Sequence, residues 1–232
     1  MRQAGPLSEK ISTLGRLLLV LIAGTVMSAC TTVSVEGTRA TSTGLLAGEG
    51  VVIMARSYHL GNKTEEKFIS CVGNSVGRGS SGLRVVPNDE FTNAVFPWLE
   101  PRTAPPDIKG LSAFMSRPGV AEKINDLGIR YVVWIDGDTD KVASGGSMSC
   151  AAGPGGGGCF GFAWWTNDAK YEATVWDLTG LESAGTVSTD VSGTSFVPAL
   201  IIPIPLIARA QSKACNGLAD QLKLFIVPEE AA

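Results

Sequence analysis

The chain has 232 residues, of which 19 are lysine or arginine, 22 are aspartate or glutamate and one is histidine, so its formal net charge is −3. This length is enough for one domain with a well-buried core. Because no basic cluster remains beyond the N-terminal segment, the composition argues against nucleic acid and anionic lipid headgroups as partners.

The N-terminal segment has the order of a secretory signal peptide. Basic residues at positions 2, 10 and 16 precede an apolar run over residues 17–23. Small residues then lead to Cys30. The apolar run is shorter than the roughly 20 residues that a bilayer core takes, so a permanent transmembrane helix is disfavoured. We therefore expect residues 1–29 to be a cleaved signal peptide and the remaining chain to work in the cell envelope.

The residues before the expected cleavage site, Met27-Ser28-Ala29-Cys30, resemble the lipobox of bacterial lipoproteins. This resemblance implies a diacylglycerol on the sulfur of Cys30, with acyl chains such as palmitate holding the protein on a membrane. Thr31 stands where an aspartate would favour the inner membrane, which implies the periplasmic face of the outer membrane. The alternative is an ordinary secretory signal followed by an incidental cysteine.

An even number of cysteines follows the lipobox, which indicates disulfides in an oxidising compartment. Cys150 and Cys159 flank a glycine-rich loop that would let them meet, and this leaves Cys71 to pair with Cys215. The alternative is a set of four buried or metal-binding thiols. Zinc is disfavoured because the chain has no Cys-x-x-Cys pair and a single histidine.

The rest of the chain divides into a tether, a domain and a tail. Residues 30–49 are rich in Thr, Ser and Gly and predict a flexible tether to the lipid. A single α/β domain then spans residues 50–227, and residues 228–232 form a tail. Hydrophobic periodicity predicts strands at 51–55, 83–86, 129–135, 160–165, 171–178 and 185–197, and helices at 64–76, 88–96, 118–127 and from 205 onward.

These elements predict an α/β fold built on a single mixed sheet of about five to six strands. Their order is β-α-β-α-β, followed by antiparallel strands and a C-terminal helix. If the first and last helices pack on the same face of the sheet, Cys71 and Cys215 both face the core there, which makes their pairing reasonable.

Three motifs suggest enzymatic or metal chemistry, but each has a simpler explanation. The G-x-S-x-G pattern around Ser75 matches a nucleophile elbow, yet that elbow follows a strand, whereas Ser75 continues a helical pattern. His59 has no evident acid or nucleophile to work with. Asp136, Asp138 and Asp140 have the spacing of a calcium loop but lack its glycine and closing glutamate, which favours a solvated acidic turn. We therefore expect no catalytic residue, metal or cofactor, and we expect that the protein is not an enzyme.

The most unusual segment runs from Cys150 to Trp165, where a glycine-rich loop leads into four aromatic residues. Phe160, Phe162 and Trp164 alternate and would share one face of a strand. Packing in the core is the simpler interpretation. The functional one is that the disulfide-closed loop and its aromatic side chains, Trp165 included, form a contact surface for a protein or glycan.

The element order, the hairpin signal at Val175–Gly180 and the closing helix through Cys215–Ala219 resemble the anticodon-binding-like α/β domain. That domain occurs in the curli secretion lipoprotein, in lipoprotein activators of peptidoglycan synthases and at the N-terminus of TolB. The resemblance spans residues 50–226 and transfers no functional residue. It implies a non-catalytic envelope module that binds a partner protein or copies of itself. The alternatives are an enzyme acting on cell-wall or envelope substrates and a structural subunit of a secretion complex.

Overall fold

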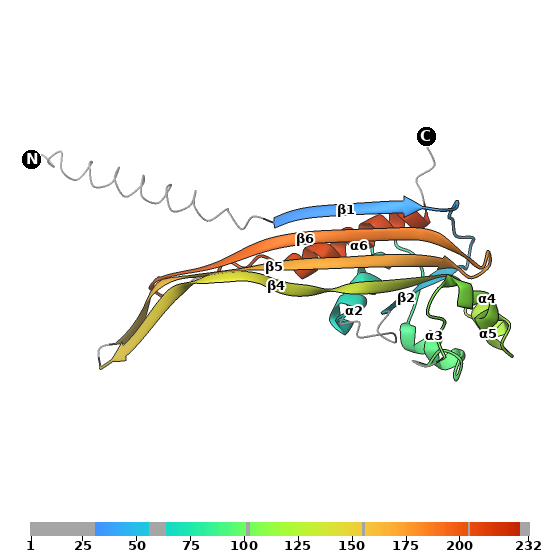
Figure 1. Ribbon diagram of the computed structural model, residues 1–232, viewed down its shortest axis with the longest axis horizontal. Coiled ribbons are helices and arrows are strands. Elements are labelled where there is room, and N and C mark those ends of the chain that lie inside the picture. Colours follow the sequence, from blue (N-terminus) through green and yellow to red (C-terminus); the bar gives the residue numbers. More distant parts are fainter. Residues whose placement is uncertain (1–30, 56–63, 101–102, 155, 204, 228–232) are drawn as a thin grey trace, which may run out of the picture.

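The computed structural model describes residues 31–227 except 56–63, 101–102, 155 and 204, so Cys30 and His59 lie outside the described residues. One six-stranded sheet, in the order β1-β6-β5-β4-β2-β3, forms its centre (Figure 1), and the predicted α/β fold with a single mixed sheet is confirmed. In chain order the elements are β1 (Thr31–Arg39), β2 (Gly50–Ala55), α2 (Glu66–Val76), β3 (Val85–Val86), α3 (Asn88–Ala94), η1 (Ile108–Gly110), α4 (Leu111–Met115), α5 (Val120–Asp126), β4 (Ile129–Gly153), β5 (Gly156–Asp177), β6 (Glu182–Ile201) and α6 (Ala210–Ile226).

The core has two layers, one on each face of the sheet. β2 pairs in parallel with β3 and β4, and its residues 51–54 are buried on both faces, as their continuous apolar run predicts. On one face α6 packs on β1, β5 and β6, and α2 packs on β2 and β3. The two helices share a core around Tyr131 and Leu218. On the other face α3, α4 and α5 cover Trp134 and Trp176. Each large apolar side chain buried in this way contributes roughly 1.5–3 kcal/mol.

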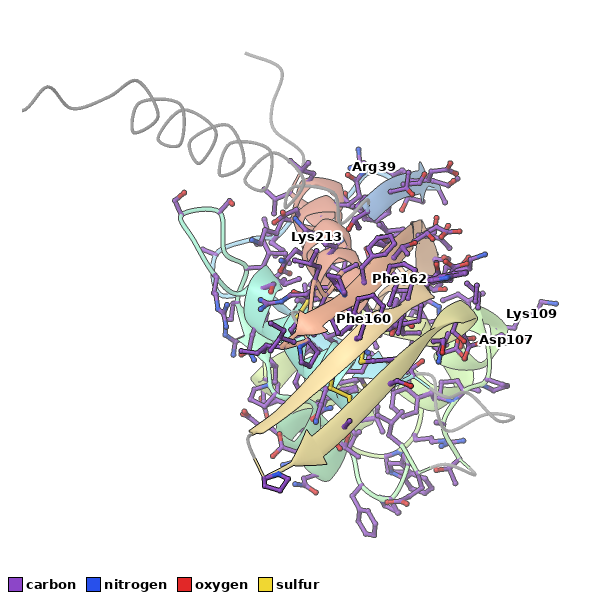
Figure 2. All side chains as sticks on the ribbon, turned by 90° about the vertical axis from the view of Figure 1, so that its left-hand side faces the viewer. Arg39, Asp107, Lys109, Phe160, Phe162 and Lys213 are labelled. Carbon is purple, nitrogen blue, oxygen red and sulfur yellow. A yellow bond between two sulfur atoms is a disulfide. The ribbon has the colours of Figure 1, made fainter. Side chains whose placement is uncertain are left out.

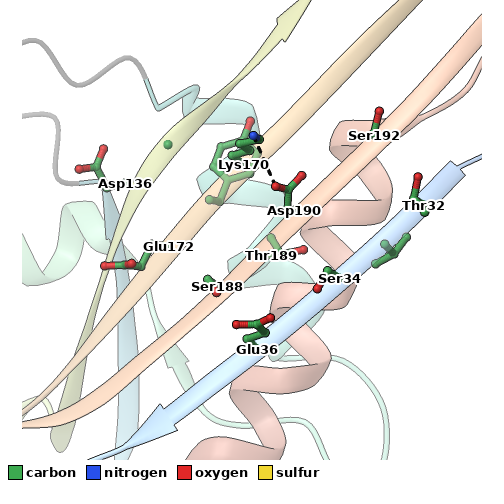
Figure 3. Close-up of a pocket in the computed structure, with 13 residues that line it drawn as sticks. Thr32, Ser34, Glu36, Asp136, Lys170, Glu172, Ser188, Thr189, Asp190 and Ser192 are labelled. Atoms are coloured by element: carbon green, nitrogen blue, oxygen red, sulfur yellow. Dashed lines mark ion pairs between the residues drawn. The ribbon is translucent and has the colours of Figure 1, made fainter.

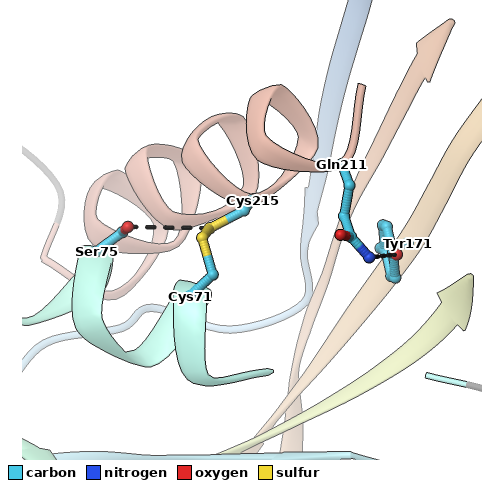
Figure 4. Close-up of a disulfide and its surroundings, with 5 residues drawn as sticks. All are labelled: Cys71, Ser75, Tyr171, Gln211 and Cys215. Atoms are coloured by element: carbon cyan, nitrogen blue, oxygen red, sulfur yellow. Dashed lines mark hydrogen bonds between the residues drawn. A yellow bond between two sulfur atoms is a disulfide. The ribbon is translucent and has the colours of Figure 1, made fainter. Parts of the chain in front are cut away.

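Both disulfides expected from the sequence are present. Cys71 on α2 and Cys215 on α6 are joined across the two helices that share a face of the sheet (Figure 4). Cys150 on β4 and Cys159 on β5 are joined directly across that hairpin, where the two residues are register partners. One bridge therefore fastens the helical layer, and the other fastens the end of a hairpin.

Strands β4 and β5 are much longer than predicted. β4 continues through Gly153, so the prediction that this strand ends at residue 135 is wrong. β5 joins the two strands predicted at 160–165 and 171–178. The aspartates at 136, 138 and 140 accordingly lie in a strand and do not form a turn. The outer part of β4 is rich in glycine and small residues, which give no hydrophobic alternation, while its backbone groups are satisfied by the neighbouring strand.

The expectation of a flexible tether over residues 30–49 is wrong for residues 31–39. These residues form β1, which pairs antiparallel with Gly185–Gly193 of β6. Thr and Val favour extended backbone, and Val35 packs against the core on the α6 side, which explains why this polar segment is ordered.

The closing helix starts at Ala210 instead of Pro205. The residues before it turn back along β6, where Leu206 and Phe196 exchange two backbone hydrogen bonds of 2.7 and 2.9 Å. Ile207, which lies before the helix and not within it as predicted, is 58% exposed. Among the described helices, none is long and apolar enough to cross a membrane.

Candidate binding surface

The outer parts of β4, β5 and β6 form a three-stranded extension that projects beyond the helices (Figure 1). We call it the arm, and it comprises residues 142–153, 156–167 and 193–201. The β4–β5 hairpin reaches farther than β6. Cys159, opposite Ile201, is the residue of β5 nearest the tip that still pairs with β6. The arm is therefore widest at its base and ends in a two-stranded tip.

The arm carries no charge. No Asp, Glu, Lys, Arg or His occurs in residues 142–167 or 191–208, although charged residues make up 18% of the whole chain. Isolated exposed apolar residues are normal on protein surfaces, but a protruding element without any ionisable group is not. This absence of charge distinguishes the arm from the remainder of the described surface.

The predicted aromatic residues lie on the arm and are not packed in the core. Phe160 is 73% exposed and Phe162 is 42% exposed, and Figure 2 shows both side chains on the arm. Trp164 follows them on the same face of β5, opposite Phe196 on β6, and the rings of Phe162 and Phe196 stack with centroids 6.0 Å apart. The interpretation of this segment as core packing is therefore wrong for Phe160 and Phe162.

The opposite face of the arm is also apolar. Trp165 lies there, half-buried, because successive residues of a strand point to opposite sides. Ile201, which pairs with Cys159 on the same face as Trp165, is 72% exposed, and Ile202 just beyond β6 is exposed to the same extent. These two isoleucines could not be predicted to be exposed, because the apolar residues in 198–202 follow neither the two-residue period of a strand nor the 3.6-residue period of a helix.

Two features hold the arm in one shape. The Cys150–Cys159 disulfide ties β4 to β5 three residue pairs from the tip. Gly146 and Gly161 both have positive φ angles, 105° and 141°, which let the two strands approach closely at positions where a side chain would collide with the opposite backbone. The arm is thus a preformed surface and not a loop that must be ordered on binding.

A polar network connects the base of the arm to helix α2. The Tyr171 hydroxyl donates to Glu65 at 2.7 Å and lies 2.7 Å from the Thr139 hydroxyl, and Gln211 of α6 donates to the same oxygen at 3.4 Å (Figure 4). The ring of Tyr171 stacks on Phe68, with centroids 3.5 Å apart. Burial raises the pKa of Tyr171 to about 12, so the hydroxyl keeps its proton and remains a donor at neutral pH.

The face of the sheet opposite α6 is open next to the arm and forms a shallow hollow lined by β1, β4, β5 and β6 (Figure 3). Asp136 and Glu172 face each other across β4 and β5, and like charges in that position repel. Lys170 is the one basic residue among those lining the hollow, and it pairs with Asp190 at 3.5 Å. This face therefore disfavours anionic partners.

The sequence motifs that suggested chemistry do not assemble into a catalytic or metal site among the described residues. Ser75 lies within α2, and its Oγ is 3.9 Å from the sulfur of Cys215, so it is not presented on a strand-to-helix turn (Figure 4). In the part of the chain that the structure describes, no three side chains of His, Cys, Asp or Glu gather in a way that could hold a metal ion.

No protein-family model and no curated protein matches this chain. Among solved structures it is similar to two PelC dodecamers from Paraburkholderia phytofirmans, at 14% and 15% sequence identity and a TM-score of 0.35 in both cases. The matches cover 85% and 86% of this chain and 99% and 100% of those chains. At this degree of likeness, function has to be argued from the residues of the chain itself.

Proposed function

We propose that this chain is a non-catalytic envelope lipoprotein that binds a partner protein, and that the arm carries the contact. The observation that supports this is the exposure of Phe160 and Phe162 on an element without charge. Exposed apolar surface on a protruding element is unfavourable in water and is a feature of surfaces that become buried against a partner. Aromatic side chains also contribute much of the binding energy at protein interfaces.

The rigidity of the arm supports the same proposal. Three paired strands and the Cys150–Cys159 disulfide fix the aromatic side chains before a partner arrives, so less conformational entropy is lost on binding. Because the arm has no charged group, its binding should depend little on ionic strength. A partner with an apolar groove or an aromatic surface of its own fits this chemistry.

We further propose that a lipid on Cys30 holds the protein on the periplasmic face of the outer membrane. β1 begins at Thr31, and Thr31 pairs with Gly193 at the base of the arm, so the anchor would be attached next to the contact element. In cells, Cys30→Ser should abolish incorporation of labelled palmitate and move the protein from the membrane fraction to the soluble fraction. An unchanged label and unchanged fractionation would refute the anchor.

A photo-crosslinking experiment in cells tests the contact. A photoreactive phenylalanine analogue is introduced at Phe160 in the full chain, with Phe96 as the matched control because it is an equally aromatic and 66% exposed residue outside the arm. One adduct of a distinct envelope protein from position 160, absent from position 96, supports the proposal. A ladder of self-adducts would favour the structural-subunit alternative, and equal adducts from both positions would overturn the role of the arm.

The enzyme alternative has a separate test. Turnover of a cell-wall substrate by the purified protein, abolished by one substitution at His59 or at an acidic residue such as Asp136, would replace the binding proposal with a catalytic one. No turnover, together with an adduct from the arm, would support the proposal.

A further inference from the structure

Strand β1 leaves one side of the sheet open. It is the outermost strand, and it pairs with β6 over all nine residues without a bulge, so its other side faces no strand among the described residues. Strand edges of this kind attract further strands, and natural proteins guard them with lysine, proline, bulges or very short lengths. β1 has none of these guards in its sequence or its register.

The two charged residues of β1 do not block the edge. Arg39 is engaged elsewhere, since it donates to the carbonyl oxygen of Phe225 at 2.9 Å and lies over the Phe225 ring. Glu36 is then the only charge along the strand. By contrast, β3 at the opposite side of the sheet has two residues, and β4 carries Asp136, Asp138 and Asp140 where it extends past β2. Outside the arm, β1 is the unguarded edge.

We propose that β1 pairs with β1 of a second copy of this chain, antiparallel and centred on Val35, joining two sheets into one. A twofold axis requires that one residue of the strand faces its own copy. Val35 is the middle residue of β1, so this register pairs all nine positions and places Glu36 opposite Ser34 of the second copy. Centring the pair on Glu36 would place two glutamates face to face, which is unfavourable.

This dimer is independent of the proposed function. It uses the backbone edge of β1, whereas the arm projects from β4, β5 and β6 and offers side chains. A partner can therefore occupy the arm while the edge is paired. The arm contact is measured by crosslinking at position 160 and the dimer by crosslinking at position 35. Failure of one proposal is therefore distinguishable from failure of the other.

Cysteine crosslinking of the purified full chain under a mild oxidant tests the register. Val35→Cys should give a disulfide-linked dimer, because residue 35 faces its own copy. The control is Val33→Cys: residue 33 is 48% exposed on the same face of the strand, but it would face Gly37 of the second copy, and the two residues 33 would stand about 13 Å apart. Equal dimer from both variants, or none from Val35→Cys, would overturn the proposal.

Charge substitutions give a second test in the Val35→Cys background. Ser34→Glu places a glutamate opposite Glu36 twice in the dimer and should reduce the dimer several-fold, whereas Ser34→Lys should preserve or increase it. Combining Ser34→Glu with Glu36→Lys should restore it. Thermal unfolding verifies that each variant is folded. An unchanged dimer in Ser34→Glu, or a crosslink to a different protein in place of the second copy, would contradict the inference, while the adduct from position 160 should not change.

Discussion

At the scale of single residues, Asp177 fixes the hairpin between β5 and β6. Its Oδ2 accepts a hydrogen bond from Arg130 at 2.7 Å, and its Oδ1 accepts from the backbone N–H groups of Thr179 and Gly180 at 2.8 and 2.9 Å. The side chain of Asp177 is 6% exposed. The Asp-Leu-x-Gly signal in the sequence thus has a physical role, because the aspartate closes the turn and neutralises Arg130.

Asp177→Ala should lower the free energy of unfolding by about 3 kcal/mol, since it leaves two backbone donors without their acceptor and leaves the Arg130 guanidinium with only its longer 3.8 Å pair to Glu49. Urea unfolding of the purified chain measures this loss. Asp190→Ala is the control, because the ion pair of Asp190 with Lys170 is more than half exposed on both sides and its loss should change stability by less than about 1 kcal/mol. Equal losses in the two variants would contradict the role of Asp177.

Tyr171 makes stability depend on pH in the alkaline range. Its pKa is raised from 10.0 to about 12, first because burial disfavours the phenolate and also through its contact with Glu65. The folded state therefore holds the proton more tightly than the unfolded state, so the stabilisation is complete below pH 10 and is lost as the pH rises towards 12. Between these values the wild-type chain should lose more stability than Tyr171→Phe. Urea titrations at several pH values compare the two slopes, and parallel slopes would refute the assignment.

At the scale of elements, the two disulfides should act on different parts of the fold. Cys71 and Cys215 are 144 residues apart in sequence, and removing both should lower the free energy of unfolding by about 5 kcal/mol. Cys150 and Cys159 are 9 residues apart, and removing both should lower it by about 3 kcal/mol or less.

Hydrogen exchange locates the effect of each bridge. Loss of Cys150–Cys159 should speed exchange in residues 142–167 alone, whereas loss of Cys71–Cys215 should speed it throughout α2 and α6. Faster exchange over the whole sheet after removal of the arm bridge would mean that the arm and the core unfold together.

The elements that could be predicted from sequence are those whose burial leaves a periodic pattern. The continuous apolar run of β2 and the helical spacing of α2 identify the core, and they also bring Cys71 to face Cys215. The elements that could not be predicted are held by backbone pairing alone. β1 and the outer half of β4 are rich in Thr, Ser and Gly, a composition typical of loops, and only the neighbouring strand makes them extended.

The exposed aromatic surface of the arm was predicted only in part. The aromatic residues at 160, 162, 164 and 165 stand out in the sequence, but alternation alone does not tell a core strand from an exposed one. What decides between them is whether a helix covers that part of the sheet. Neither face of the arm is covered by a helix, because the helices end at its base (Figure 1). This information resides in the tertiary arrangement, and no local pattern encodes it.

At the scale of the whole molecule, the arm and the core are separable. Neither hydrophobic core cluster contains a residue from 142–167, so the apolar contacts that stabilise the fold are made elsewhere. Ser147 and Phe162 are register partners on β4 and β5, and the hairpin can be closed there. Replacing residues 148–161 by Asn-Gly, a dipeptide suited to a two-residue hairpin turn, would remove the tip with its disulfide and Phe160. Adding Phe162→Thr would remove the remaining exposed ring.

This shortened chain should keep a melting temperature within about 5 °C of the full chain, because it retains both core layers and the Cys71–Cys215 bridge. It should nevertheless fail to retain the partner that crosslinks to position 160, while Val35→Cys in the same background should still give the dimer. Thermal unfolding, partner capture and the cysteine crosslink measure the three properties in one preparation. A large loss of stability would mean that the arm is part of the core, and undiminished partner capture would mean that the contact lies elsewhere on the domain.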